Sequence, residues 1–191
     1  LDNEIENVFD KNSNLDSSLL LTEVSNLIKG EQGPYSLINL LPHYSNISEP
    51  RVLFSYAPIK HERLYTLLDE REYEKINIIV PNGSSPKHRL AKISAEFSLR
   101  KFNNAEIHYI EDSNITGMLE ILAKDYYTYF ILNNFPFEIA LTGSKLQTIS
   151  AAIFSSVFKI SQCWYVKPKL WDKNRFSKGY LSTSFFQVLI K

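Results

Sequence analysis

The sequence predicts an α/β protein of the Rossmann-like class, and three observations lead to this prediction. Short, nearly continuous apolar runs recur along the chain, helical periodicity separates them, and Pro, Gly or Asn follows several of them. Strands that alternate with helices indicate right-handed βαβ crossovers and a mostly parallel sheet with helices on both faces. We therefore expect a mostly parallel, six-stranded sheet.

The N-terminal segment is the least regular part of the sequence. An Asp-Ser pair at positions 16–17 can cap a helix over Leu19–Ile28, which a Lys-Gly pair would end. A second apolar run, Tyr35–Leu41, stops at a proline. We expect residues 1–50 to form a helical extension beside a Rossmann-like domain over residues 51–191.

From residue 51 onward, expected strands and helices alternate. The strands are expected at Val52–Tyr56, Ile76–Val80, Ala105–Ile110, Phe137–Leu141, Cys163–Val166 and Ser184–Ile190. Apolar residues at helical spacing predict the intervening helices at Leu64–Leu68, Pro86–Phe102, Met118–Leu122 and Leu146–Val157, with Pro86 in the first turn of the second. A loop containing Pro, Lys and Gly joins the last two strands without a helix, so the C-terminal strand is expected to be an antiparallel edge.

The composition excludes several classes of protein. Lys+Arg and Asp+Glu both number 21, so the formal net charge is +0, and duplex DNA is not an expected partner. The single cysteine, Cys163, excludes an intramolecular disulfide and suits a reducing compartment. No apolar run approaches the roughly 20 residues that span a bilayer, and the acidic N-terminus is unlike a signal peptide. We expect a cytoplasmic protein with no membrane partner.

The loop after the fourth expected strand is the most informative part of the sequence. Ligands of open α/β sheets bind beyond the carboxyl ends of the strands, where helix N-termini present N–H groups to anions. Here Thr142 and Ser144 offer hydroxyls, Gly143 permits close approach of a ligand, and Lys145 brings a cation, with Gln147 one turn further on. The alternative is that Ser144 only caps the helix and Lys145 is solvated.

The stronger nucleotide-binding fingerprints are missing from the sequence. It contains no G-x-G-x-x-G after the first expected strand, no G-x-x-x-x-G-K-[ST] and no G-x-S-x-G. NAD binding and ATP hydrolysis are therefore disfavoured, and we expect no cofactor.

The segment around this loop resembles a known family. A strand ending in Leu-Thr-Gly-Ser-Lys precedes the Ala/Ser-rich stretch Ser150-Ala151-Ala152 and a strand ending Trp164-Tyr165-Val166. This arrangement is similar to the CRISPR-associated Rossmann fold (CARF) domains over roughly residues 51–191, although Ser144 stands where that family more often has a second glycine. The resemblance implies binding of cyclic oligoadenylates at a homodimer interface, which activates a neighbouring catalytic domain.

Three further loops supply candidate ligand-binding residues. After the first expected strand, Ser55 offers a hydroxyl, Tyr56 a ring that can stack on a base, and Lys60 and Arg63 cations for a phosphate; a solvated helix start is the alternative. Asn82, in the loop after the second strand, can bond a ribose or phosphate or belong to a simple turn. Lys167 belongs to a basic cluster that a solvated edge loop would also explain. Its other members are Lys169, Lys173, Arg175 and Lys178, around Trp171 and Tyr180.

Other titratable residues give weaker signals. The four histidines lie on different expected elements, so no metal site is expected. Glu111 and Asp112 could act as an acid/base pair, but Asp112 is more simply the N-cap of the next helix.

These observations predict a regulatory domain that senses a nucleotide-type anionic ligand, in keeping with a role in antiviral defence. An enzyme that cleaves or transfers a nucleotide or phosphosugar in the same cleft is one alternative, with Lys145, Lys60 and His61 as its charged groups. A structural assembly module is another. We expect a homodimer, and, since the chain begins at Leu1 rather than Met, a fused or associated effector domain.

Overall fold

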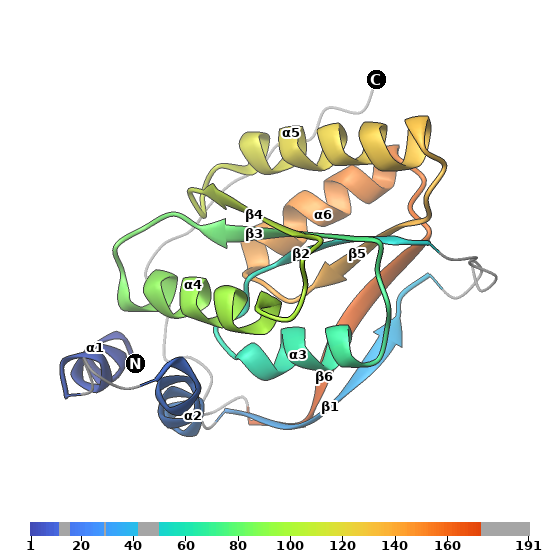
Figure 1. The fold of residues 1–191 in the computed structure, drawn as a ribbon. Helices are drawn as coiled ribbons and strands as arrows, with labels where there is room; N and C mark the ends of the chain where they lie inside the picture. The colour runs from blue at the N-terminus through green and yellow to red at the C-terminus, as the bar shows by residue number, and fades with distance from the viewer. Residues whose placement is uncertain (12–15, 29, 42–49, 173–191) are drawn as a thin grey trace.

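The computed structural model of the chain describes residues 1–11, 16–28, 30–41 and 50–172, which are arranged around one six-stranded sheet (Figure 1). The strands are β1 (Glu31–Asn39), β2 (Val52–Tyr56), β3 (Lys75–Pro81), β4 (Ala105–Ile110), β5 (Phe137–Leu141) and β6 (Gln162–Trp171). The helices are α1 (Asp2–Lys11), α2 (Ser17–Leu27), α3 (His61–Asp69), α4 (Pro86–Leu99), α5 (Ile115–Tyr126), the π-helix η1 (Tyr127–Leu132) and α6 (Lys145–Val157).

The strand order confirms the predicted fold class. The sheet runs β1-β6-β5-β2-β3-β4; the pairs among β2 to β6 are parallel, and β1 pairs antiparallel with β6. Read from β4, the five parallel strands follow the 3-2-1-4-5 order of a doubly wound Rossmann-like sheet. The chain thus reverses direction across the sheet between β2 and β5.

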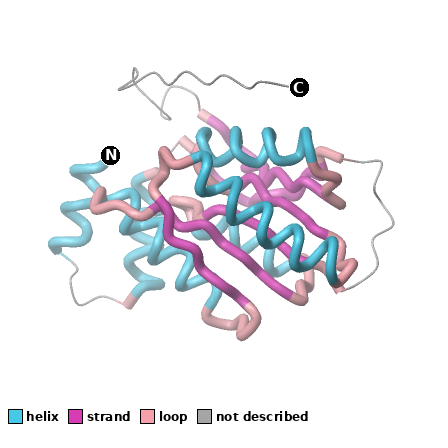
Figure 2. The backbone as a smooth tube through the Cα atoms, turned by 90° about the horizontal axis from the view of Figure 1, so that it is seen from above, coloured by secondary structure: helices cyan, strands magenta, loops and turns pink. Residues whose placement is uncertain are grey.

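Two apolar layers hold helices on opposite faces of the sheet. On one face, α3 and α4 pack leucines and alanines against Leu53, Ile78 and Val80. On the other, α5 and α6 pack against Phe54 and Ile139, and Figure 2 shows helices covering the strands. Burial on both faces explains why β2 and β3 are nearly continuous apolar runs rather than alternating ones.

The N-terminal region corrects one expectation. The helix expected over Leu19–Ile28 is confirmed as α2, and α1 and α2 pack through a separate apolar cluster against Leu90 of α4. The following segment is not helical: β1 forms the antiparallel edge strand, with Leu37 opposite Val166 of β6. The expected division at residue 51 therefore does not coincide with the edge of the sheet.

The C-terminal region differs from expectation in length. β6 continues past Val166 to Trp171, and beyond Tyr165 its parallel register with β5 has ended. An open edge on that side tolerates Pro168 within the strand, because the missing N–H has no ladder bond to make there. The strand predicted at Ser184–Ile190 lies outside the described residues. Within the described ranges, no helix has the length and apolar character needed to cross a bilayer.

Candidate functional site

The candidate site lies where the sheet changes direction, at the carboxyl ends of β2 and β5. The two strands pair in parallel, with Ser55 opposite Ala140, so the loops that follow them emerge side by side. In open α/β sheets such a switch point is where ligands bind. The structure therefore places Ser55, near the end of β2, beside Thr142 in the loop after β5.

The hydroxyl of Ser55 in β2 and that of Thr142 in the β5–α6 loop bond to each other. Thr142 and Ser55 are buried, and their hydroxyl oxygens lie 2.8 Å apart. The Thr142 hydroxyl also donates to the backbone carbonyl of Tyr56. These contacts join β2 to the β5–α6 loop, so both hydroxyls serve the scaffold of the site.

Tyr56 lies in the core rather than in the cleft. Its ring is wholly buried and packs edge-on against Phe54, and its hydroxyl lies 2.8 Å from the Ser150 hydroxyl of α6. Burial raises the pKa of the Tyr56 phenol. With no exposed ring face, Tyr56 is not placed to stack on a base, which corrects that expectation.

A capping box fixes the start of α6. The Ser144 hydroxyl accepts from the Gln147 backbone N–H at 3.3 Å, and the Gln147 side-chain oxygen accepts from the Ser144 N–H at 2.7 Å. A Cβ added to Gly143 would lie 1.9 Å from the Gln147 Oε1 and 2.6 Å from the Tyr56 Cβ. Packing of the capping box against β2 therefore explains the glycine without a ligand.

The first turn of α6 still presents groups suited to an anion. The capping box occupies two of the four N-terminal N–H groups, and those of Lys145 and Leu146 have no acceptor within the helix. The Lys145 side chain is exposed. Gln147 is 1% exposed, and its side-chain nitrogen has no hydrogen-bond partner among the described residues.

Asp112 connects α5 to the same helix start. The Ser144 hydroxyl donates to the Asp112 carboxylate at 3.0 Å. The N-cap of α5 is Asn114, whose side chain accepts from the Gly117 N–H at 2.9 Å. This corrects the expectation that Asp112 caps α5: its carboxylate instead lies at the positive end of the α6 dipole.

Lys60, the N-cap residue of α3, and Arg63, in the first turn of that helix, bind Glu31 of β1. Lys60 is 7% exposed and donates to the backbone carbonyl of Glu31, and burial lowers the pKa of its amine. Arg63 donates twice to the Glu31 carboxylate, each time at 2.5 Å. Neighbouring His61 lies 3.3 Å from Glu62, and burial lowers its pKa. Contacts within the protein thus account for Lys60 and Arg63 without a phosphate.

Two predicted residues remain exposed at this end of the sheet. Asn82 follows β3, and its backbone N–H donates to the Ile110 carbonyl at 2.7 Å. The Asn82 residue is exposed to solvent. Lys167 is two residues beyond Tyr165, the partner of Leu141 in β5. Residues two apart share one face of a strand, so Lys167 lies on the same face as Cys163, which is the α6 face. Lys167 is exposed as well.

A buried charge cluster around Glu138 was not predicted, and it lies at the opposite, amino end of the parallel strands, which we call the amino edge. Glu138, near the start of β5, is wholly buried. Its carboxylate accepts from the Trp164 indole N–H at 2.7 Å, the Arg71 guanidinium at 3.1 Å and the Tyr73 hydroxyl at 3.2 Å, and Arg51 lies 3.7 Å away. A glutamate inside an apolar strand pattern was the available sequence signal.

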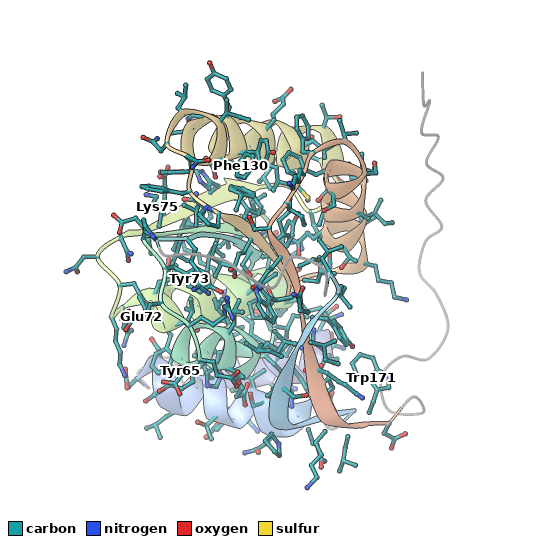
Figure 3. All side chains as sticks on the ribbon, turned by 90° about the vertical axis from the view of Figure 1, so that its right-hand side faces the viewer. Tyr65, Glu72, Tyr73, Lys75, Phe130 and Trp171 are labelled. Atoms are coloured by element: carbon teal, nitrogen blue, oxygen red, sulfur yellow. The ribbon has the colours of Figure 1, made fainter. Side chains whose placement is uncertain are left out.

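A cavity of about 800 Å³ adjoins this cluster. It is lined by Arg51, Leu68, Asp69, Glu70, Arg71, Glu72, Tyr73 and Phe102. Figure 3 shows Glu72 and Tyr73 together on this side of the molecule. The two arginines in the cavity wall contact Glu138, near the start of β5. The cavity therefore lies at the amino end of the parallel strands, whereas the predicted ligand loops lie at their carboxyl end.

Two further properties limit the chemistry of the described residues. They contain no group of three or more His, Cys, Asp or Glu side chains that could hold a metal ion. Burial raises the pKa of the Cys163 thiol to about 11, so this cysteine is an unreactive core residue.

Comparison with known proteins assigns no family to this chain. No protein-family model matches the sequence, and no curated protein matches it significantly.

Proposed function

We propose that this domain is CARF-like and senses a nucleotide-type anionic ligand at the switch point between β2 and β5. One observation carries the proposal: the free N–H groups at the start of α6 lie beside exposed Lys145, at the position where open α/β sheets bind ligands. The Leu-Thr-Gly-Ser-Lys turn, which resembles the CARF motif, occupies this position.

The structural context narrows the proposed contacts. The backbone of the first turn of α6 and the Lys145 amine bind the phosphate, because the Ser55 and Thr142 hydroxyls are engaged with each other. Asn82 and Lys167 remain available at the same end of the sheet. Asp112, a hydrogen-bond acceptor beside Ser144, favours a ligand that also carries a hydroxyl or amino donor, such as a nucleotide.

Binding of a panel of nucleotides to the purified chain tests this proposal. The melting temperature should rise when AMP, linear oligoadenylates or cyclic oligoadenylates are added. A ligand at 100 times its dissociation constant stabilises the folded state by about 2.7 kcal/mol. Equal stabilisation by inorganic phosphate alone would indicate a simple anion site. No stabilisation by any member of the panel would contradict the proposal.

The proposed sensor acts as a homodimer in the cytoplasm, coupled to a fused or associated effector. The outer surface of α6 supports a two-fold interface beside the ligand loop, since Ala152 is exposed and Ile149 and Ile153 are half-buried. Light scattering with and without ligand measures the oligomeric state. A monomer at tens of micromolar, in both conditions, would contradict this part of the proposal.

A further inference from the structure

The two outermost strands of the sheet differ in how they are protected against pairing with another strand. β1, on one side, contains Pro34 and a register irregularity between Gln32 and Tyr35. β4, on the other side, lies beyond β3 (Figure 1) and pairs with β3 alone among the described residues. Its six residues run in unbroken register and contain no Pro, Gly or Lys. Prolines, bulges and lysines are the usual devices that keep an outermost strand from pairing, so β4 has an unprotected open side.

The backbone groups on the open side of β4 belong to alternate residues. The Asn82 N–H, after β3, donates to the Ile110 carbonyl at 2.7 Å. Backbone groups alternate in direction along a strand, so the even-numbered residues of β4 bond to β3 and the odd-numbered ones point outward. The outward residues are Ala105, Ile107 and Tyr109. Their N–H and C=O groups have no hydrogen-bond partner among the residues that the structure describes.

Polar side chains of β4 lie on the α5 face, and apolar ones lie on the α4 face. Ala105 and Ile107 pack in the layer of α3 and α4, so Glu106 and His108, which alternate with them, face α5. Tyr109 shares the α4 face and is 47% exposed. A strand added to this side of β4 therefore meets a carboxylate and an imidazole on one face and an aromatic ring on the other.

We propose that β4 of a second copy of this chain occupies the open side of β4, paired antiparallel about a two-fold axis at Ile107. An axis normal to the sheet makes the two strands antiparallel and keeps the α5 layers of both copies on one face. Ile107 then pairs with its own copy, and Ala105 pairs with Tyr109 in both directions. Each of these pairs exchanges two hydrogen bonds, so every outward backbone group of β4 gains a partner. One continuous sheet runs through both copies.

The side chains on the α5 face favour this register over its neighbours. It sets Glu106 of each copy opposite His108 of the other, at a position without backbone hydrogen bonds, where opposed side chains are closest. An imidazole has an N–H to donate to a carboxylate in either protonation state. A shift by two residues in one direction sets Glu106 opposite its own copy, which is unfavourable. A shift in the other direction sets His108 opposite itself, and either shift loses one hydrogen-bonded pair.

This interface is independent of the proposed nucleotide site. β2 and β3 separate β4 from β5, which leads into the ligand loop. The two-fold axis at Ile107 also differs from the one proposed at the α6 surface. Pairing through β4 should therefore form without ligand, and it is measured without ligand.

Disulfide cross-linking tests the register. Ile107→Cys should cross-link to its own copy under oxidising conditions, because the paired Cα atoms lie about 5.5 Å apart, within the range that a disulfide spans. Tyr109→Cys is the matched control at a more exposed position. Its two copies are offset by four residues, about 13 Å along the strand, so it should not cross-link. The native Cys163 is buried, and burial raises the pKa of its thiol, so it does not compete.

A backbone variant keeps the proposal testable if Ile107→Cys does not fold. Tyr109→Pro removes an N–H that β4 does not donate to β3, so the protomer retains its own sheet. The dimer loses this N–H at both copies of Tyr109. Light scattering at tens to hundreds of micromolar should therefore show a dimer for the wild type. Tyr109→Pro should dimerise at least about tenfold more weakly than Tyr109→Ala, which keeps the N–H.

Three results would overturn the proposal. They are a wild-type monomer throughout this concentration range, cross-linking of Tyr109→Cys as fast as that of Ile107→Cys, and equal dimerisation of Tyr109→Pro and Tyr109→Ala. Ala152→Arg, on the exposed surface of α6, should leave the cross-linking of Ile107→Cys unchanged. A dimer that Ala152→Arg dissociates and Tyr109→Pro does not would assign the interface to α6 and overturn pairing through β4. Loss of nucleotide binding with intact cross-linking would contradict only the proposed function.

Discussion

The two ends of the parallel strands, called here the carboxyl edge and the amino edge, differ in how their polar residues are bonded. At the carboxyl edge, Ser55 bonds to Thr142 and Ser144 to Gln147, and Arg63 pairs with Glu31, while Lys145 remains exposed beside these contacts. At the amino edge, the carboxylate of Glu138 is buried and contacts two guanidiniums. The carboxyl edge thus keeps exposed groups beside a fixed scaffold, while the amino edge commits its charges to holding strands together.

This difference separates binding from stability. A buried, fully bonded carboxylate is expected to matter for folding, because removal of one partner leaves other charges buried without compensation. An exposed lysine at a helix start is expected to matter only when an anion is present. Variants at the two edges should therefore change different measured quantities.

The largest expected effect comes from Glu138→Ala at the amino edge. It would leave the Arg71 and Arg51 guanidiniums, the Tyr73 hydroxyl and the Trp164 indole N–H without this acceptor. We expect the free energy of unfolding to fall by about 3–5 kcal/mol, measured by urea denaturation. Glu72→Ala, an exposed glutamate on the wall of the same cavity, should change it by less than about 0.5 kcal/mol. Similar small losses in both variants would remove the contrast between the edges.

A smaller effect is expected from Arg63→Ala, which tests whether the first turn of α3 belongs to the scaffold or to the ligand site. Glu31 is 3% exposed and would lose both bonds to its guanidinium partner. We expect a loss of about 2–3 kcal/mol, below the range for fully buried pairs because Arg63 is partly exposed. Arg100→Ala, at an exposed site on α4's end, is the control and should cost less than about 1 kcal/mol. Intact stability with weakened nucleotide binding would instead place Arg63 in the ligand site.

Much of the fold could be predicted because its signal is local. Each parallel strand is a short apolar run, and Ser85 before Pro86 marks the start of α4. β1 could not be predicted in this way. Its Tyr35 and Leu37 face the core while Ile38 and Leu40 are exposed, so apolar residues on both faces hide the alternation, and its partner β6 is far away in sequence.

The candidate site could be predicted only as a set of loops. Residue types show that Lys60 and Arg63 can meet a phosphate, but not that Glu31 lies beside them, because this contact needs β1 at the sheet edge. For the same reason the burial of Glu138 depends on Arg71 and Trp164 from two other segments. Long-range pairing decides which charges remain free for a ligand.

Gly143→Ala tests whether the β5–α6 loop is a tightly packed part of the scaffold. The added methyl would collide with the Gln147 Oε1 and the Tyr56 Cβ, so the capping box must shift. We expect a loss of about 1–3 kcal/mol in the free energy of unfolding, the usual range for overpacking. Ser156→Ala, on the exposed side of the same helix, should stay within about 0.5 kcal/mol. A Gly143→Ala variant as stable as wild type would mean that the loop is loose.

The smallest effect on stability is expected from Lys145→Ala, and this variant tests the comparison most directly. A cation at a helix start opposes the macrodipole, so without ligand the free energy of unfolding should stay constant or rise by up to about 0.5 kcal/mol. Nucleotide affinity should fall by about 1.5–3 kcal/mol, the range for a hydrogen bond to a charged group. Isothermal titration and urea denaturation measure the two quantities, and Lys101→Ala, another exposed lysine, should change neither. Equal affinities of wild type and Lys145→Ala would remove this lysine from the proposed site, and a large loss of stability without ligand would assign it to the scaffold instead.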